Sequence, residues 1–337
     1  MTTISEASSA AGTGALAVGD GERRPHSLGL LAVAGFLWLA LAAFVFWLPD
    51  AQEVERTRLF GLLAAAFGVV QLAGWGAGWF APAARPLIRS APWLIVLALW
   101  FLVWELVTAK FDLLPLPFFP SPQAFVGVYT DDWPRLADSL LHSLWLLARG
   151  FVIGAAIGFA VGVALGWSKR VGYWIHPVMR LVGPLPATAW LPLAFFIFPT
   201  SASASTFLIV LATAFPVTVL TWSGVAGVSS AYYDVARTLG ATSRFQILKV
   251  AIPAALPHVF VGLFMGLGSS FAVLVVAEML GVKSGLGWYL QWAQGWAAYA
   301  NMYGALLVMA LMCSALVTLL FRLRDRLLAW QKGLVQW

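Results

Sequence analysis

The feature that most constrains this chain is a series of apolar stretches, each about 20 residues long, that follow one another along almost its whole length. A helix needs about 20 predominantly apolar residues to cross the hydrocarbon core of a bilayer. The 337 residues contain eight such stretches: Leu28 to Leu48, Leu59 to Phe80, Trp93 to Ala109, Ser143 to Gly166, Met179 to Phe198, Thr206 to Gly224, Val259 to Leu280 and Tyr303 to Phe321. The sequence therefore predicts an all-α polytopic membrane protein.

The composition supports this prediction and excludes several other classes of protein. Apolar residues make up 61% of the chain and charged residues 10%, whereas soluble domains have about 45–50% and about 25%. A soluble enzyme is therefore excluded. The single cysteine, Cys313, rules out a framework of internal disulfides. The net charge is +6, but the basic residues are scattered between apolar stretches, so we expect no nucleic-acid partner.

The placement of lysine and arginine predicts the orientation in the membrane, because cytoplasmic connectors carry an excess of these residues. With the N-terminus inside, few basic residues fall on the opposite side: Arg56, Arg58, Lys110, Arg135 and Lys283. Most of the others fall on cytoplasmic connectors, while Arg149 lies inside a stretch. We therefore expect both termini to be cytoplasmic.

Both ends of the chain differ in composition from the apolar stretches. Residues 1–27 are rich in small and polar residues, which predicts a disordered cytoplasmic tail. No signal peptide is expected, since Arg23 and Arg24 precede an apolar stretch of full spanning length. Residues 322–337 interleave arginine with leucine and tryptophan, the pattern of a cytoplasmic amphipathic tail at the membrane surface.

The stretch from Met179 to Phe198 is unusual because it contains Pro184, Pro186 and Pro192. Backbone groups freed by proline are tolerated at membrane depth where protein or a water-filled cavity satisfies them. These prolines are therefore candidate pathway residues, although a kinked packing helix would explain them equally well.

Three ionisable residues lie within or at the ends of apolar stretches, where charge is costly and often functional. Glu278 is a candidate pathway residue near the outer mouth, or it holds the turn at Gly281 by a hydrogen bond. Glu105 and Arg149 lie in neighbouring stretches and could pair with each other. Arg149 could alternatively attract an anion.

The connector between the sixth and seventh stretches is long and patterned. Asp234 to Leu239 is predicted to form a short helix, and Gly240 suits a left-handed stop. Ala241 to Val250 then predicts a second helical piece that ends before Pro253. Together they should form an elbow on the cytoplasmic side.

This elbow resembles the EAA coupling loop of ABC importer permeases. The pattern is an acidic residue, a small pair, a glycine and, further on, two apolar residues before a proline; the matching residues are Asp234, Val235, Ala236, Gly240, Val250, Ile252 and Pro253. Aspartate replaces the usual glutamate, and valine replaces the first alanine.

Other strings resemble the nitrate, sulfonate, taurine and bicarbonate branch of these permeases. They occur in the expected order: FFPSPQAF, RLVGPLPATAWLPLAFF, DVARTLGATSRFQILKVAIPAALPHVFVGL and VVAEMLGVKSGLGWYL. The resemblance runs from Trp93 to the C-terminus. It implies a six-helix ABC importer permease core at residues 91–321, with a coupling loop at about 225–257. Residues 28–90 would then add two extra transmembrane helices in front of the core.

The resemblance also implies a function and a set of partners. The chain would be a permease subunit of an ATP-driven, binding-protein-dependent importer for a small anion in the bacterial inner membrane. It would work with a second copy of the permease, two cytoplasmic ATPase subunits, and a periplasmic or lipid-anchored solute-binding protein.

The sequence lacks the phosphate-binding pattern G-x-x-x-x-G-K-[ST]. We therefore expect no enzymatic activity and no cofactor in this chain, with ATP and magnesium bound by the ATPase partner. The alternative is a secondary transporter working without an ATPase. Such a protein could use paired acidic residues at membrane depth, for which only Glu105 and Glu278 are available.

Overall fold

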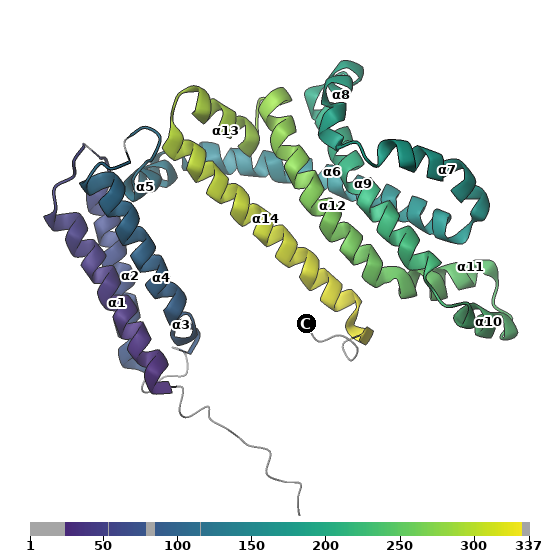
Figure 1. Cartoon of the computed structure of the whole chain (residues 1–337), viewed down its shortest axis with the longest axis horizontal. Helices are drawn as coiled ribbons and strands as arrows, with labels where there is room; N and C mark the ends of the chain where they lie inside the picture. The colour runs from purple at the N-terminus through teal and green to yellow at the C-terminus, as the bar shows by residue number, and fades with distance from the viewer. Residues whose placement is uncertain (1–23, 53, 79–84, 115, 332–337) are drawn as a thin grey trace, which may run out of the picture. The chain divides into compact units, whose positions relative to one another are not determined.

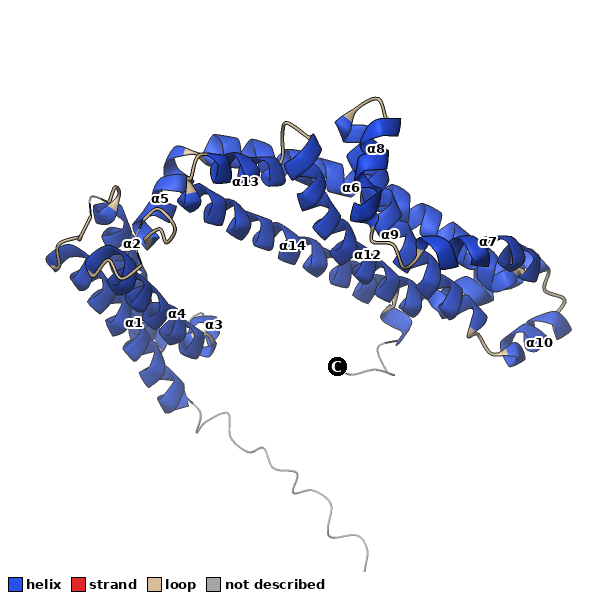
Figure 2. Cartoon of the chain, turned by 45° about the horizontal axis from the view of Figure 1, so that its top comes forward, coloured by secondary structure: helices blue, strands red, loops and turns tan. Residues whose placement is uncertain are grey.

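The computed structural model describes residues 24–52, 54–78, 85–114 and 116–331, and every regular element in these ranges is a helix (Figures 1 and 2). The predicted disordered tail of residues 1–27 lies outside them, apart from its last four residues, which begin α1. The α-helices are α1 (Arg24–Trp47), α2 (Thr57–Gly78), α3 (Arg85–Arg89), α4 (Ala91–Glu105), α5 (Pro122–Asp131), α6 (Trp133–Trp167), α7 (Lys169–Val182), α8 (Leu191–Ile197), α9 (Ser201–Ala226), α10 (Ser230–Thr238), α11 (Ser243–Gln246), α12 (Ile252–Gly281), α13 (Leu286–Gly295) and α14 (Tyr299–Leu327). The π-helical turns are η2 (Leu106–Lys110) and η4 (Ile247–Ala251), and the 3₁₀ turns are η3 (Ala187–Trp190) and η5 (Ala329–Gln331).

Seven helices of the described chain are long and apolar enough to cross a membrane: Leu28–Trp47, Thr57–Gly78, Ala91–Lys110, Trp133–Trp167, Ser201–Ala226, Ser243–Gly281 and Tyr299–Leu327. An eighth crossing results if Lys169–Val182 and Ala187–Ile197, which meet at 86°, count as one broken span. This break falls in the proline-rich stretch. The predicted all-α polytopic fold is confirmed.

The chain divides into two compact units, residues 1–127 and 128–337. The first unit contains α1 to α4, and α5 crosses the division. The sequence placed the boundary between extra helices and permease core at residue 90. In the structure, α4 lies in the same compact unit as α1 and α2, because Ala98 and Phe101 of α4 pack with Trp38 of α1. The indole Nε1 of Trp38 also donates a hydrogen bond to the carbonyl of Leu94, at 3.3 Å. The boundary of the permease core at residue 90 stays a prediction.

A fully buried lysine joins the ends of two helices in the first unit. The Lys110 ammonium donates to the carbonyls of Val45 at 3.2 Å and Leu48 at 2.7 Å, in the last turn of α1 and directly after it. It also lies 2.6 Å from the Asp50 carboxylate and 3.6 Å from that of Glu105. Because these carbonyls have no partner within α1, the cation caps its C-terminus.

The predicted pairing of Glu105 with Arg149 is therefore wrong. Glu105 lies beside Lys110, five residues on, and its Oε1 accepts a hydrogen bond of 2.7 Å from Gln123. Arg149 donates to Thr206 and to the carbonyl of Ala202. Glu105 and Lys110 are one π-turn apart, a local pairing that an apolar-stretch argument does not detect.

Replacing Lys110 by methionine should destabilise the first unit by about 3–5 kcal/mol, because removing one partner leaves buried carboxylate charge uncompensated. The thermal unfolding midpoint of the purified protein checks this. Arg58→Met removes an exposed basic residue of α2 and serves as the matched control. Equal midpoints for the two variants would show that the Lys110 contacts do not stabilise the unit.

The second unit is organised by a seam of glycines between α6 and α9. Glycine occurs at every fourth position of α6, at residues 150, 154, 158, 162 and 166. A Cβ atom at any of them would lie 2.5–2.7 Å from an atom of α9. Small residues at this spacing let helix backbones approach closely in a membrane, where packing drives association. The two helices therefore run in contact along most of their length.

Helix α12 packs antiparallel on the same α9. Gly262 faces Val217, and Gly266 faces Thr213, with added Cβ atoms 3.1–3.2 Å from the α9 backbone. Helix α9 is thus enclosed by α6 and α12 and forms the centre of the second unit. Within this unit, α8 and α13 lie at one end, and α10 and α11 lie at the other (Figures 1 and 2).

Candidate functional site: the elbow between α9 and α12

The elbow consists of α10, α11 and η4, which connect the end of α9 to the start of α12. It projects from the end of the second unit at which α6 and α9 finish (Figure 1). The predicted helix from Asp234 to Leu239 corresponds to α10, which begins four residues earlier, at Ser230.

The turn after α10 has the hydrogen bonds of a Schellman motif. Gly240 has φ of +78°, which confirms the predicted left-handed conformation. Its N–H donates to the carbonyl of Arg237 at 2.9 Å, and that of Ala241 donates to the carbonyl of Ala236 at 2.9 Å. A Cβ at Gly240 would have no atom within 4 Å. The demand for glycine is therefore purely conformational.

The second arm of the elbow does not stop before Pro253, so that prediction is wrong. Thr242 caps α11 by accepting a hydrogen bond from the N–H of Phe245 at 3.4 Å. Helix α11 then continues through the π-turn η4 into α12, giving one helical segment from Ser243 to Gly281. Pro253 lies within this segment and is tolerated because it lies just after the π-turn η4, where the helical hydrogen-bond pattern is already altered.

Small residues hold the elbow against the helix bundle. Ala251 and Ala255 are fully buried against Val225, the last turn of α9. A Cβ on Gly224 would lie 2.8 Å from the Cβ of His258, so α9 and α12 cross closely here. These contacts attach the elbow to both transmembrane helices.

An aromatic pair joins the elbow to the end of α6. Tyr233 packs edge-on against Trp167 with 5.7 Å between ring centroids. Burial raises the pKa of the Tyr233 phenol, which keeps it protonated. The elbow thus packs against α6, α9 and α12 and is not held by its chain connections alone.

The surface that borders the open groove between the two arms of the elbow is apolar. Tyr232, Val235 and Leu239 are 61–82% exposed and recur at positions i, i+3 and i+7, on one face of α10. Phe245 and Leu248 add exposed apolar area from the second arm. Apart from Val235, sequence reasoning missed these residues. Their helical spacing was the signal that could have revealed them.

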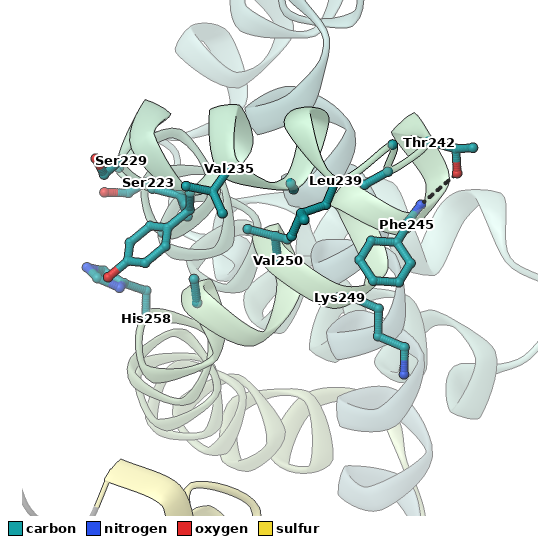
Figure 3. A pocket seen from close by; sticks show the side chains of 17 residues that line it. Ser223, Ser229, Val235, Leu239, Thr242, Phe245, Lys249, Val250 and His258 are labelled. Atoms are coloured by element: carbon teal, nitrogen blue, oxygen red, sulfur yellow. Dashed lines mark hydrogen bonds between the residues drawn. The ribbon is translucent and has the colours of Figure 1, made fainter.

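A cavity of about 1210 Å³ lies between the two arms of the elbow (Figure 3). Of the seven residues predicted for coupling, Val235, Ala236, Gly240 and Val250 line it. Lys249 and His258 lie at opposite sides of it (Figure 3).

The other three predicted coupling residues do not line this cavity. Asp234 is exposed and lies 3.5 Å from Arg237 on the same helix. Ile252 and Pro253 form the beginning of α12.

The proline-rich zone forms a second hollow, of about 340 Å³, between the α7–α8 break, α9 and α12. Of the predicted pathway prolines, Pro186 lines it, whereas Pro184 and Pro192 do not. Two hydroxyl-bearing side chains, Thr188 and Ser269, also line it. The structure thus brings the break in the span against α9 and α12.

Glu278 forms part of a buried hydrogen-bond network at the opposite end of the unit from the elbow. Its carboxylate accepts from Ser143 at 2.7 Å and from the N–H of Gly287 at 2.8 Å. The Ser143 hydroxyl accepts in turn from the N–H of Leu286 at 2.7 Å. Gly285 has φ of +107°, and a Cβ there would collide with the Glu278 carboxylate. Glu278 therefore holds the turn before α13 against α6, and its pathway role stays a prediction.

A bundle of membrane-crossing helices with an apolar elbow between two of them is the architecture expected of a transport permease. The chain belongs to the family of binding-protein-dependent transport system inner membrane components, whose profile matches residues 150–332. This confirms the predicted ABC importer permease family. The secondary transporter considered from the sequence gains no support.

Similar proteins agree with this assignment. A putative aliphatic sulfonates transport permease of Bacillus subtilis is 28% identical, over 77% of this chain and 89% of that protein. A nitrate import permease of Synechococcus elongatus is 27% identical, over 75% of this chain and 91% of its own length. Among solved structures, an inward-facing methionine ABC transporter chain superposes with a TM-score of 0.50 at 16% identity. It covers 57% of this chain and 95% of its own, which supports the permease fold.

Proposed function

We propose that this chain forms half of the transmembrane pathway of an ATP-driven importer for a small anion of the sulfonate or nitrate kind. A second copy would form the other half, two ATPase subunits would bind the elbows, and an external binding protein would deliver the solute. ATP and magnesium would be bound by the ATPase subunits. The names of the similar permeases support this choice of solute class.

The observation that carries the proposal is the exposed apolar face of α10. Large apolar patches on the surface of a protein mark interaction sites. Tyr232, Val235 and Leu239 project from a helix that its Schellman turn and the packing of Tyr233 hold in place. Such a surface can transmit force, since its position is fixed relative to α9 and α12.

The orientation follows from this assignment. An ATPase that uses cytoplasmic ATP places the elbow in the cytoplasm, in agreement with the excess of lysine and arginine on that side. Both termini would then be cytoplasmic, in the bacterial inner membrane. The hollow beside Pro186 and the exposed small residues Gly268, Ser269 and Ala272 of α12 would face the pathway.

Reconstitution tests the proposal. The permease is combined in proteoliposomes with a candidate ATPase and a candidate binding protein from the same organism, and uptake of radiolabelled sulfonate and nitrate is measured. We expect uptake that requires both ATP and the binding protein, and native mass spectrometry should show two permease copies per two ATPases. Uptake without ATP would contradict the importer, and a different second permease would contradict the homodimer.

A further inference from the structure

Arg149 is an exposed cation in the middle of an apolar sequence on α6. Both of its hydrogen bonds come from Nη2, to Thr206 and, at 3.3 Å, to the carbonyl of Ala202. Neither partner carries a charge. Within the described residues, no carboxylate lies within salt-bridge distance, which leaves Nε and Nη1 for an acceptor outside the chain.

The position of Arg149 along α6 indicates its depth in the membrane. Helix α6 ends at Trp167, directly before the basic residues Lys169 and Arg170. Eighteen residues separate Trp167 from Arg149, or about 27 Å of helix. The hydrocarbon core is about 30 Å thick. When Trp167 lies at one boundary of the core, Arg149 therefore lies close to the other.

The exposed face of α6 changes character at this residue. On the Trp167 side of Arg149, the exposed face carries Val152, Ile153 and Ile157, which are 42–65% exposed and suited to acyl chains. On the other side it carries Trp145, which is 69% exposed, and His142. Tryptophan and arginine are the residues that typically mark the level of lipid headgroups.

We propose that Arg149 binds the phosphate of a phospholipid headgroup, in the leaflet opposite the one that contacts Lys169. Thr206 and the Ala202 carbonyl orient the guanidinium through Nη2, and the N–H groups of Nε and Nη1 remain to donate hydrogen bonds to phosphate oxygens. The first 16 residues of α6, Trp133 to Ala148, then lie outside the hydrocarbon core. This site is independent of the solute and of the proposed transport function.

Lipid binding to the full-length permease provides the test. The delipidated protein is titrated with phosphatidylglycerol, and bound lipid is counted by native mass spectrometry. Arg149→Gln should weaken the tightest lipid site about fivefold, as expected for one arginine at a lipid surface, and Arg149→Lys should retain an intermediate affinity. Arg135→Gln is the control, because Arg135 is an exposed residue of the same helix that already contacts Asp132 and the Trp292 ring. Equal binding by wild type and Arg149→Gln would overturn the proposal.

A competition experiment distinguishes a lipid phosphate from a free oxyanion as the ligand of Arg149. Excess ethanesulfonate or sulfate should not displace the lipid from the wild type. Displacement would show that Arg149 takes a free oxyanion instead, and would overturn the lipid assignment.

A depth measurement does not depend on the arginine variants folding. Cys313 is the only cysteine, so Cys313→Ser allows a single spin label at Ala148→Cys, an exposed position beside Arg149. Its accessibility to oxygen and to a polar nickel complex should place it at the headgroup boundary. A position at the bilayer centre, or protection from both reagents by a partner chain, would overturn the proposal.

Discussion

Replacing Gly240 by valine is expected to abolish ATP-driven uptake by the assembled importer, whereas asparagine at the same position should preserve most of it. Gly240 has φ of +78° in the turn that closes α10. A left-handed conformation costs an ordinary residue roughly 1–2 kcal/mol, and a β-branched residue more. Asparagine tolerates it. Strain of about 2 kcal/mol at a docking surface weakens binding more than tenfold.

The measurement combines uptake with ATPase activity of the complex in proteoliposomes. Because no atom lies within 4 Å of a Cβ at Gly240, a loss in Gly240→Val reports backbone conformation and not a steric clash. Gly76→Val is the matched control, since Gly76 of α2 is equally open but has ordinary helical geometry. If the Gly240→Val complex assembles and transports at the wild-type rate, the turn at Gly240 has no role in coupling.

The second large effect is expected at the glycine seam. Gly158→Val would place a Cβ 2.6 Å from the carbonyl oxygen of Ala214 and 2.9 Å from the Cβ of Val217. A backbone carbonyl within a helix cannot rotate away, so α6 and α9 must separate. Overpacking costs about 1–3 kcal/mol and occasionally more. Because α9 is packed by both α6 and α12, we expect little folded permease.

Thermal unfolding can be followed with a thiol-reactive dye, since partly buried Cys313 becomes accessible when the protein unfolds. The midpoint of this transition measures the stability of each variant. Ala156→Val is the control. It places the same valine side chain on the exposed face of the same helix. The control should melt like the wild type. A Gly158→Val protein with an unchanged midpoint would show that the seam tolerates separation.

The sequence predicts the crossings well because each of them requires its own apolar run. It also predicts the turn at Gly240, since few residues other than glycine adopt a left-handed stop. The elbow's position between two crossings follows from its length and its pattern. These features are local, and each depends on a short segment of the chain.

Features that depend on the path of the helix or on distant partners could not be predicted. Pro253 suggested a helix end, but the π-turn η4 directly before it lets the helix continue. Lys110 caps the end of α1 by binding the carbonyl of Leu48, 62 residues earlier in the chain. Neither sequence segment contains a pattern that predicts this contact. Similarly, Glu278 meets Ser143 only because α6 and α12 pack in the same unit.

In the proposed importer, the continuous segment from Ser243 to Gly281 would act as a lever across the membrane. Its 39 residues span about 58 Å, from the elbow to the turn that Glu278 holds. A displacement of the elbow by a bound ATPase would therefore reach the far side of the bilayer through one helix, without passing through a chain of side-chain contacts. The segment has two places where it can bend: the π-turn η4, where the hydrogen bonding shifts to i+5, and Pro257, which removes a helical hydrogen bond. The stiffness of the helix at these two places would thus determine how much of a displacement of the elbow reaches the far side.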